Sequence, residues 1–305
     1  MTEARANVGD VELVYETIGD PSGEPMLLVM GLGMQLIHWD IELCELLAER
    51  GFFVVRFDNR DAGRSTQVRA PVPNVMRLMA GMPAPVPYLL DDMANDAFGL
   101  LDQLGVERAH LVGTSMGGMI AQTMAIARPE RVLSLASMLS TTGDRRGGTP
   151  KLRVWSVLMR RAPRDRDAYV EYFVRVFRTI GSPGYRADEQ RIRERAAATY
   201  DRGHHPAGTA RQLAAILASP SRTAALRELD LPTVVIHGEE DPLVPFRAGQ
   251  ATARAIPGAR FFGIPEMGHD MPKELWPAFV DAIVKNAERG GEAAGVSPTP
   301  LGARP

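Results

Sequence analysis

Ser115 lies between two glycines in the segment GTSMG (113–117). The apolar run before it (109–113) is predicted as a strand, and the residues after it are predicted as a helix. A direct turn from strand to helix strains the backbone of the residue at the turn, and flanking glycines relieve the crowding. The serine hydroxyl then stands clear of the sheet and can attack a carbonyl carbon. The amide of Met116, at the helix N-terminus, would donate to the resulting oxyanion.

A serine hydroxyl needs a general base, and we predict His269 for that role. It lies in a loop between the last predicted strand (259–264) and the last predicted helix (273–289), at the carboxyl edge of the sheet. The other histidines are less suited, because they lie in a glycine-rich loop, near core strands or in a helical segment: His38, His110, His204, His205 and His237.

An acid must orient the histidine, and the segment GEEDPLVP (238–245) supplies it directly after a predicted strand (233–238). We predict Asp241, at the apex of this loop, while Glu239 and Glu240 remain alternatives. The interval between Asp241 and His269 has room for one helix and one strand, so their loops should be neighbours. The chain order serine, acid, histidine is known for one class of α/β enzymes.

A second oxyanion donor is expected from the loop after the first buried strand, MGLG (30–33). Gly31 and Gly33 allow the backbone to approach a substrate closely, and we predict the Leu32 amide as the donor. Gly31, His38 and Trp39 are predicted to line a substrate pocket. The methionine-rich segment 75–90 could also line it, with packing in the core or cap as an equal alternative.

The elements that position these residues alternate between strand and helix, which predicts a mostly parallel sheet covered on both faces. An early edge strand is expected at 11–19. The remaining predicted strands are 25–31, 52–58, 109–113, 131–140, 233–238 and 259–264, and the helices between them include 41–51, 88–105 and 273–289.

The residues from 142 to 227 interrupt this alternation, since they contain helical patterns and no convincing strand. We therefore predict a helical cap at 142–227, a core formed by 1–141 and 228–289, and a flexible tail at 290–305. The cap is rich in arginine, and we expect that charge to form a solvated outer face.

Composition argues against several classes of partner and site. The 305 residues carry a net charge of −2, which does not favour nucleic-acid binding, and the single cysteine, Cys44, excludes an internal disulfide. We expect Cys44 to be a buried structural thiol. No signal peptide or transmembrane run is visible, so a soluble cytoplasmic protein is expected, as a monomer or homodimer, without membrane contact. No metal or dinucleotide site has the required spacing.

Five segments together resemble the α/β-hydrolase superfamily over roughly residues 10–285: MGLG (30–33), FDNRDAGRS (57–65), GTSMGG (113–118), GEEDPLVP (238–245) and MGHD (267–270). The similarity is greatest to the esterase branch related to aclacinomycin methylesterase. This resemblance implies an eight-stranded, mostly parallel sheet with an antiparallel second strand, and ester hydrolysis without a cofactor. Many relatives have His-Gly where this chain has Met30-Gly31, which could change how that loop is anchored.

The sequence thus predicts a serine carboxylesterase that acts on small to medium esters through an acyl-enzyme. A carbon–carbon bond hydrolase or a cofactor-free perhydrolase could use the same three residues, and a non-catalytic ligand receptor could share the fold. Arg60 and Arg64 could contact substrate, but we favour a structural loop in which they pair with Asp58.

Overall fold

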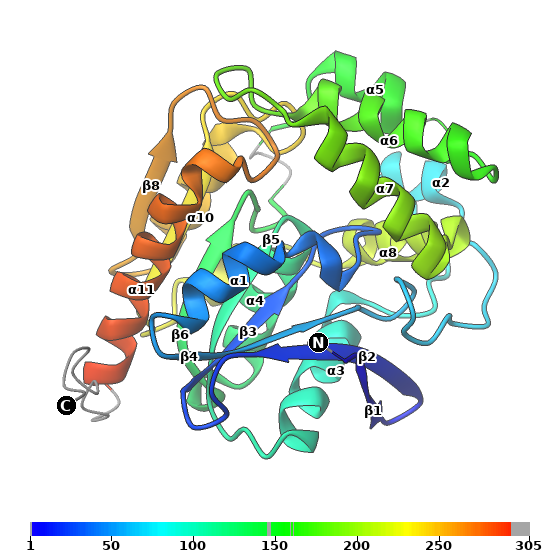
Figure 1. The fold of residues 1–305 in the computed structure, drawn as a ribbon. Helices are drawn as coiled ribbons and strands as arrows, with labels where there is room; N and C mark the ends of the chain where they lie inside the picture. Colours follow the sequence, from blue (N-terminus) through cyan, green and yellow to red (C-terminus); the bar gives the residue numbers. More distant parts are fainter. Residues whose placement is uncertain (1, 145–147, 159, 161, 294–305) are drawn as a thin grey trace.

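A computed structural model describes residues 2–144, 148–158, 160 and 162–293. One eight-stranded sheet runs through the protein in the order β1-β2-β4-β3-β5-β6-β7-β8 (Figure 1). Only β2 runs against the other strands, as the resemblance implied. The strands are β1 (Ala4–Val8), β2 (Val11–Ile18), β3 (Glu24–Val29), β4 (Phe52–Phe57), β5 (Ala109–Thr114), β6 (Val132–Met138), β7 (Thr233–Gly238) and β8 (Arg260–Ile264).

The predicted edge position of residues 11–19 is wrong, because β1 pairs along the outer side of β2. Sequence patterning missed β1, because it has only five residues, two of them alanines with low strand propensity, and only Ala6 is buried. In the centre of the sheet, Leu27 of β3 lies opposite Val55 of β4 and Leu111 of β5, and all three are fully or almost fully buried. Continuous apolar runs were therefore a sound sign of strands covered on both faces.

Helices cover both faces of the sheet. The helices α1 (Ile41–Ala48) and α11 (Trp276–Ala293) pack on one face around Met26, Leu28 and Val54. The other face carries α3 (Leu90–Gln103), α4 (Met116–Ala127) and α10 (Phe246–Ala255). The sheet is thus the middle of three layers, and the carboxyl ends of its strands are left to carry a site. Within the described residues, no helix has the length and hydropathy needed to span a membrane.

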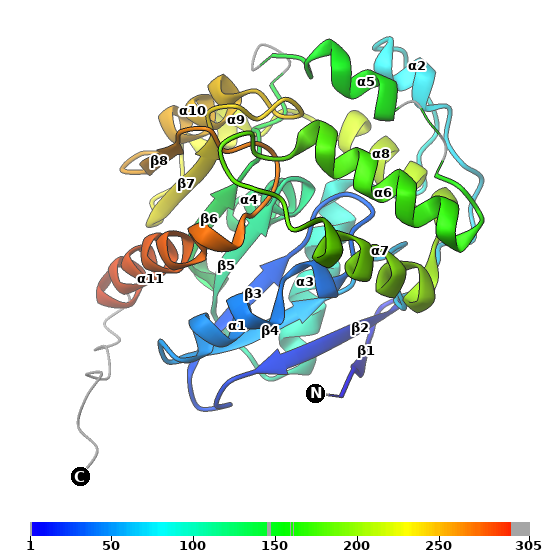
Figure 2. The same ribbon diagram turned by 45° about the horizontal axis from the view of Figure 1, so that its top comes forward.

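A group of helices joins β6 to β7, and no strand occurs among the described residues of 142–227. The helices are α5 (Leu152–Leu158), α6 (Arg166–Ile180), α7 (Glu189–Gly203), α8 (Pro206–Ala218) and α9 (Thr223–Leu226). Figures 1 and 2 show α5 to α8 lying above the ends of the central strands, whereas α9 packs against α4 and α10. We call α5 to α8 the cap helices; the cap boundaries at 142 and 227 stay a prediction.

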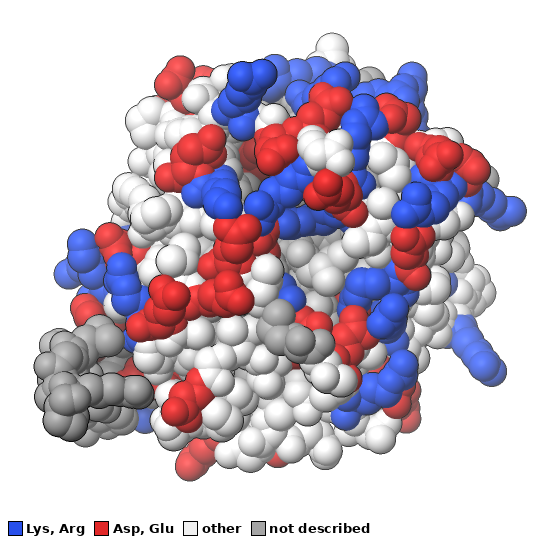
Figure 3. Space-filling view, in the orientation of Figure 1, with Lys and Arg blue, Asp and Glu red and all other residues white. Residues whose placement is uncertain are grey.

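The expectation of a purely solvated arginine face is wrong for four arginines of α7 and α8. Arg191 and Arg195 pair with Asp40. Arg202 pairs with Asp58 and Glu3, and Arg211 pairs with Asp61. Other charges of the cap helices do lie outside, where Figure 3 shows basic and acidic side chains interspersed. Four arginines therefore join the cap helices to carboxylates of the sheet domain. Composition alone did not reveal that these side chains point inward.

Candidate active site

Ser115 occupies the turn between β5 and α4 with φ 55° and ψ −120°, a left-handed conformation that a non-glycine residue adopts only under strain. The neighbouring glycines are required by space. A Cβ on Gly113 would lie 2.2 Å from the Gly117 carbonyl oxygen, and one on Gly117 would lie 2.0 Å from the Val29 carbonyl oxygen. The predicted reason for the glycines is therefore visible in the packing of the turn.

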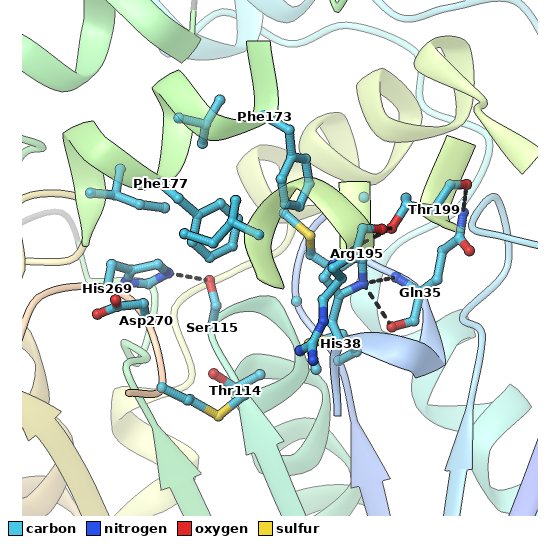
Figure 4. Close-up of a pocket in the computed structure, with 18 of the residues that line it drawn as sticks. Gln35, His38, Thr114, Ser115, Phe173, Phe177, Arg195, Thr199, His269 and Asp270 are labelled. Carbon is cyan, nitrogen blue, oxygen red and sulfur yellow. Dashed lines mark hydrogen bonds between the residues drawn. The ribbon is translucent and has the colours of Figure 1, made fainter. Parts of the chain in front are cut away.

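His269 lies in the loop between β8 and α11, beside the Ser115 hydroxyl. Its Nε2 is 3.1 Å from Ser115 Oγ, and its Nδ1 is 2.6 Å from Asp241 Oδ2 (Figure 4 shows the contact with Ser115). Because a carboxylate only accepts, Nδ1 carries the proton and Nε2 is left as the acceptor for the serine hydroxyl. The backbone amide of His269 donates to the Ile180 carbonyl over 2.7 Å, which anchors this loop to the end of α6.

Asp241 is buried and held on both carboxylate oxygens. Its Oδ1 accepts from the amides of Leu243 and Val244, both at 2.8 Å, and its Oδ2 accepts from His269. Burial acts to raise the pKa of Asp241, but the charge of His269 and hydrogen bonds from His237 and His269 outweigh it and hold the pKa below its usual range. The carboxylate therefore stays ionised beside the imidazole.

The alternative acids are directed elsewhere. Glu239 and Glu240 are exposed, and Glu240 pairs with Lys151 at 3.2 Å. Of the three acidic residues considered in this loop, Asp241 alone has a contact with His269 in the structure's described hydrogen bonds and ion pairs. The loop geometry thus separates the three residues that sequence left as alternatives.

The two backbone amides predicted as oxyanion donors belong to residues close to Ser115. Met116 is the first residue of α4, and the first amides of a helix have no acceptor within it. A Cβ on Gly31 would lie 3.2 Å from the Ser115 Cβ, so the peptide that leads to Leu32 runs directly beside the nucleophile. Asn59 Nδ2 donates to the Met30 carbonyl over 3.1 Å and anchors the loop from below. This placement is compatible with the predicted donors.

A cavity of about 620 Å³ opens above Ser115 and His269. Its walls are mainly apolar and come from both the cap helices and the sheet domain, including Leu43, Leu139, Tyr169, Phe173, Phe177 and Ile180. Figure 4 shows Phe173 and Phe177 projecting toward Ser115 from above. A volume of this size is typical of a pocket for a small organic ligand.

Of the three predicted pocket residues, Gly31 and His38 line the cavity and Trp39 does not. Trp39 is fully buried in the core between the sheet and α1, near Leu43 and Cys44. Adjacent residues at the end of the short helix η1 (Leu36–His38) point to opposite sides, which the sequence could not show. Cys44 is buried, as expected.

Of the two alternatives for residues 75–90, the structure shows packing. None of them lines the cavity; α2 (Val75–Met79) packs against α8, and Leu78 and Tyr88 are buried, whereas Met76 and Met82 are 59% and 45% exposed. The loop 57–65 is structural, as favoured, but its partners differ. The Arg60 side chain binds Asp96 and the Arg64 side chain binds Glu3, while the Asp58 carboxylate pairs with Arg202 of α7 and accepts only the backbone amide of Arg64 from the two predicted arginines.

The aromatic wall of the cavity was missed at the sequence level. Tyr169, Phe173 and Phe177 follow one another at intervals of four residues in α6, so they share one helix face. That spacing could have marked the face that covers the site. The polar lining residues Thr199 and Arg195 carried no comparable signal.

Comparison with known proteins decides the family. The sequence profile of the alpha/beta hydrolase fold matches residues 24–274. The chain belongs to this α/β-hydrolase family. Both the predicted superfamily and the predicted fold are thus confirmed.

Among its curated relatives, this α/β hydrolase is similar to two methylesterases. It is 33% identical over 304 residues to the rhodomycin D methylesterase DauP of Streptomyces sp. (strain C5), an alignment that covers 90% of this chain and 94% of the relative. It is 32% identical over 302 residues to the rhodomycin D methylesterase DnrP of Streptomyces peucetius, with the same shares of each chain covered. The predicted resemblance to a methylesterase branch is confirmed.

A solved structure agrees on the fold. The enol-lactonase from Burkholderia xenovorans LB400 superimposes with a TM-score of 0.73 at 23% identity, covering 93% of this chain and 99% of that one. Within the residues that the structure describes, no three His, Cys, Asp or Glu side chains gather as a metal site would require. In this α/β hydrolase, the arrangement of hydroxyl, imidazole and carboxylate is suited to nucleophilic acyl transfer.

Proposed function

We propose that this α/β hydrolase is a serine carboxylesterase with Ser115, His269 and Asp241 as its catalytic residues. The observation that carries the proposal is the single imidazole that contacts both Ser115 Oγ and the buried carboxylate. The methylesterase relatives support the same reaction class.

In the first half of the reaction, Ser115 Oγ attacks the ester carbonyl carbon and His269 Nε2 takes its proton. Asp241 stabilises the imidazolium that forms, and the amides of Leu32 and Met116 hold the oxyanion. The tetrahedral intermediate collapses when its bond to the alcohol oxygen breaks, and His269 protonates the departing alcohol. The acyl group remains on Ser115.

In the second half, a water molecule takes the place of the alcohol. His269 removes one of its protons, the water oxygen attacks the acyl carbon, and the same two amides hold the second oxyanion. Collapse releases the acid and returns the proton to Ser115 Oγ. The cycle needs no cofactor, since each proton that His269 accepts is given back.

The substrate class follows from the cavity and the relatives together. A mostly apolar cavity of about 620 Å³ fits small to medium acyl groups, and the relatives named as methylesterases favour a methyl alcohol portion. We therefore propose hydrolysis of methyl esters and other short to medium esters.

A fluorophosphonate probe and the Ser115→Ala variant test this proposal. We expect one probe molecule to attach to wild type at Ser115, and the variant to lose both labelling and ester turnover while keeping its melting temperature. Ser221→Ala is a matched control, because Ser221 is exposed and contacts Thr223, so it should label and turn over normally. A folded wild type that takes up no probe would instead support a non-catalytic receptor.

Chain-length dependence tests the substrate class. Rates with p-nitrophenyl esters of increasing acyl length should be highest for short to medium chains, because the cap helices close the cavity above Ser115. A maximum confined to long chains would contradict the proposed class.

A further inference from the structure

His38 lies in the same cavity as Ser115 but in a different part of it. Figure 4 shows Ser115 and His269 together, and His38 grouped with Gln35 and Thr199 across the pocket. The His38 side chain belongs to η1, is only 6% exposed and packs against the ring of Phe173, with 5.7 Å between ring centroids. No step of the proposed reaction uses it.

The hydrogen bonds around His38 indicate which nitrogen carries the proton. Its Nδ1 lies 3.1 Å from both the amide nitrogen and the carbonyl oxygen of Gln35. That carbonyl already accepts from the backbone amide of His38 over 3.0 Å, whereas the Gln35 amide needs an acceptor because it is buried. Nδ1 therefore accepts from the Gln35 amide, and the proton is on Nε2.

The Nε2–H donor is only weakly engaged by the protein. Its nearest partner is Thr199 Oγ1 at 3.4 Å, which is longer than a good N–H···O hydrogen bond. Thr199 spends its own proton on the Arg195 carbonyl, 2.7 Å away, so its oxygen is an acceptor only. His38 and Thr199 both line the cavity, so this donor is within reach of a bound molecule.

The donor is also uncharged. Burial, together with the positive charges of Arg195 and Arg202, outweighs the hydrogen bond with the Gln35 backbone and lowers the pKa of His38 to about 3, so the ring stays neutral in ordinary buffers. Those two arginines pair with Asp40 and Asp58 respectively, so their charges are balanced by core carboxylates. Around His38 the cavity thus presents a neutral N–H, and the two neighbouring arginines already have carboxylate partners.

We propose that His38 is a specificity-determining residue whose Nε2–H binds an uncharged oxygen, such as a ketone, ether or phenol oxygen, in the acyl group of the substrate. The inference rests on the proposed function, in which the alcohol portion of the ester is small and the acyl group therefore occupies most of the cavity. Such an acyl group is apolar where it contacts Phe173 and Phe177. It also carries one oxygen acceptor, placed along its chain so that the oxygen reaches His38 Nε2 when the ester carbonyl lies at Ser115.

Matched methyl esters test the proposal: methyl octanoate and its 4-, 5-, 6- and 7-oxo analogues, with acid release followed in a pH-stat. The measured quantity is kcat/KM for each oxo ester divided by kcat/KM for methyl octanoate. One neutral hydrogen bond should make this ratio about three- to tenfold higher in wild type than in His38→Leu, for the analogue whose ketone reaches His38. His38→Gln keeps an N–H donor and should restore part of the ratio.

His110→Gln is the control variant, because it changes a buried histidine that contacts Ser134 and Glu24 outside the cavity. Its ratios should equal those of wild type. The proposal is overturned if all four ratios agree within twofold between wild type and His38→Leu. Failure of wild type to hydrolyse any of the five esters would overturn the esterase assignment with it, whereas equal ratios on good substrates overturn the role of His38 alone.

Nitrogen NMR of the histidine rings gives a readout that does not depend on turnover. We expect the His38 resonances, assigned by their loss in His38→Gln, to show a neutral ring protonated on Nε2 at pH 7. A ring protonated on Nδ1, or a charged one, would overturn the proposal because no neutral donor would then face the cavity.

Discussion

Replacing Asp241 by asparagine should invert the hydrogen bond that orients His269. Oδ1 must stay a carbonyl oxygen, since it accepts from the amides of Leu243 and Val244 at 2.8 Å and a flipped side chain would leave both half-buried donors facing an NH₂ group. The new NH₂ group then takes the place of Oδ2, 2.6 Å from His269 Nδ1. A donor at that position requires Nδ1 to be unprotonated, which moves the ring proton to Nε2.

The consequence for catalysis is large. With its proton on Nε2, His269 would donate to Ser115 Oγ across the 3.1 Å contact and could not accept the hydroxyl proton. Loss of the correct tautomer and of the stabilising charge in a serine triad lowers kcat by on the order of 10⁴, or about 5 kcal/mol of transition-state stabilisation. The assay is kcat with p-nitrophenyl butyrate, alongside the rate of fluorophosphonate labelling, which should fall in parallel.

Circular dichroism and the melting temperature must show that Asp241→Asn is folded. Glu240→Gln is the matched control, because Glu240 is exposed and its ion pair with Lys151 leads away from His269, so kcat should stay within about twofold of wild type. An Asp241→Asn enzyme that retains more than a tenth of the wild-type kcat would refute the reasoning. So would a large loss in the Glu240 variant.

Three further predictions concern stability and reactivity. Arg211→Met should lower the free energy of unfolding, measured by urea titration, by about 3–5 kcal/mol, because it leaves the Asp61 carboxylate buried without its bidentate partner. Arg166→Met removes an exposed ion pair and should change the same quantity by less than about 1 kcal/mol. Folding lowers the pKa of His38 from 6.5 to about 3, so the unfolded chain binds the proton first as the pH falls. Between pH 8 and pH 5, the free energy of unfolding of wild type should therefore fall by about 2 kcal/mol more than that of His38→Gln. Equal losses in the two proteins would contradict the assignment. Burial raises the pKa of the Cys44 thiol to about 12, so a disulfide reagent at pH 8 should modify no thiol in the folded protein and one after unfolding; rapid reaction of the folded protein would show that the site opens.

The turn at Ser115 could be predicted from sequence because all its determinants are local. Strand, glycine, serine, glycine and helix follow within a few residues, and the steric conflict that the glycines avoid is between atoms of that turn and of the adjacent strand β3. The parallel sheet was predictable for a similar reason, since strands buried on both faces need continuous apolar runs. The short strand β1, in which Arg5 and Asn7 interrupt the apolar residues, has no such run and escaped notice.

Asp241 and His269 were predicted from their places at the carboxyl ends of strands, but sequence could not separate Asp241 from Glu239 and Glu240. That choice depends on the loop between β7 and α10, in which the Leu243 and Val244 amides bind one carboxylate oxygen and leave the other for the imidazole. The direction of the Asp241 side chain is thus set both by amides of its own loop and by His269 in a distant loop.

The sequence by itself determined the order of strands and helices and the residue types that meet at the sheet edge, because periodicity, glycine turns and apolar runs act between near neighbours. Only the tertiary structure decided whether a given side chain points into the cavity, into the core or toward solvent. His38 enters the cavity while Trp39 enters the core, and Arg202 turns inward to Asp58 instead of outward to solvent. Thr199, which contacts His38, and Asp58, which contacts Arg202, each lie more than a hundred positions from that partner, and no short stretch of sequence contains that information.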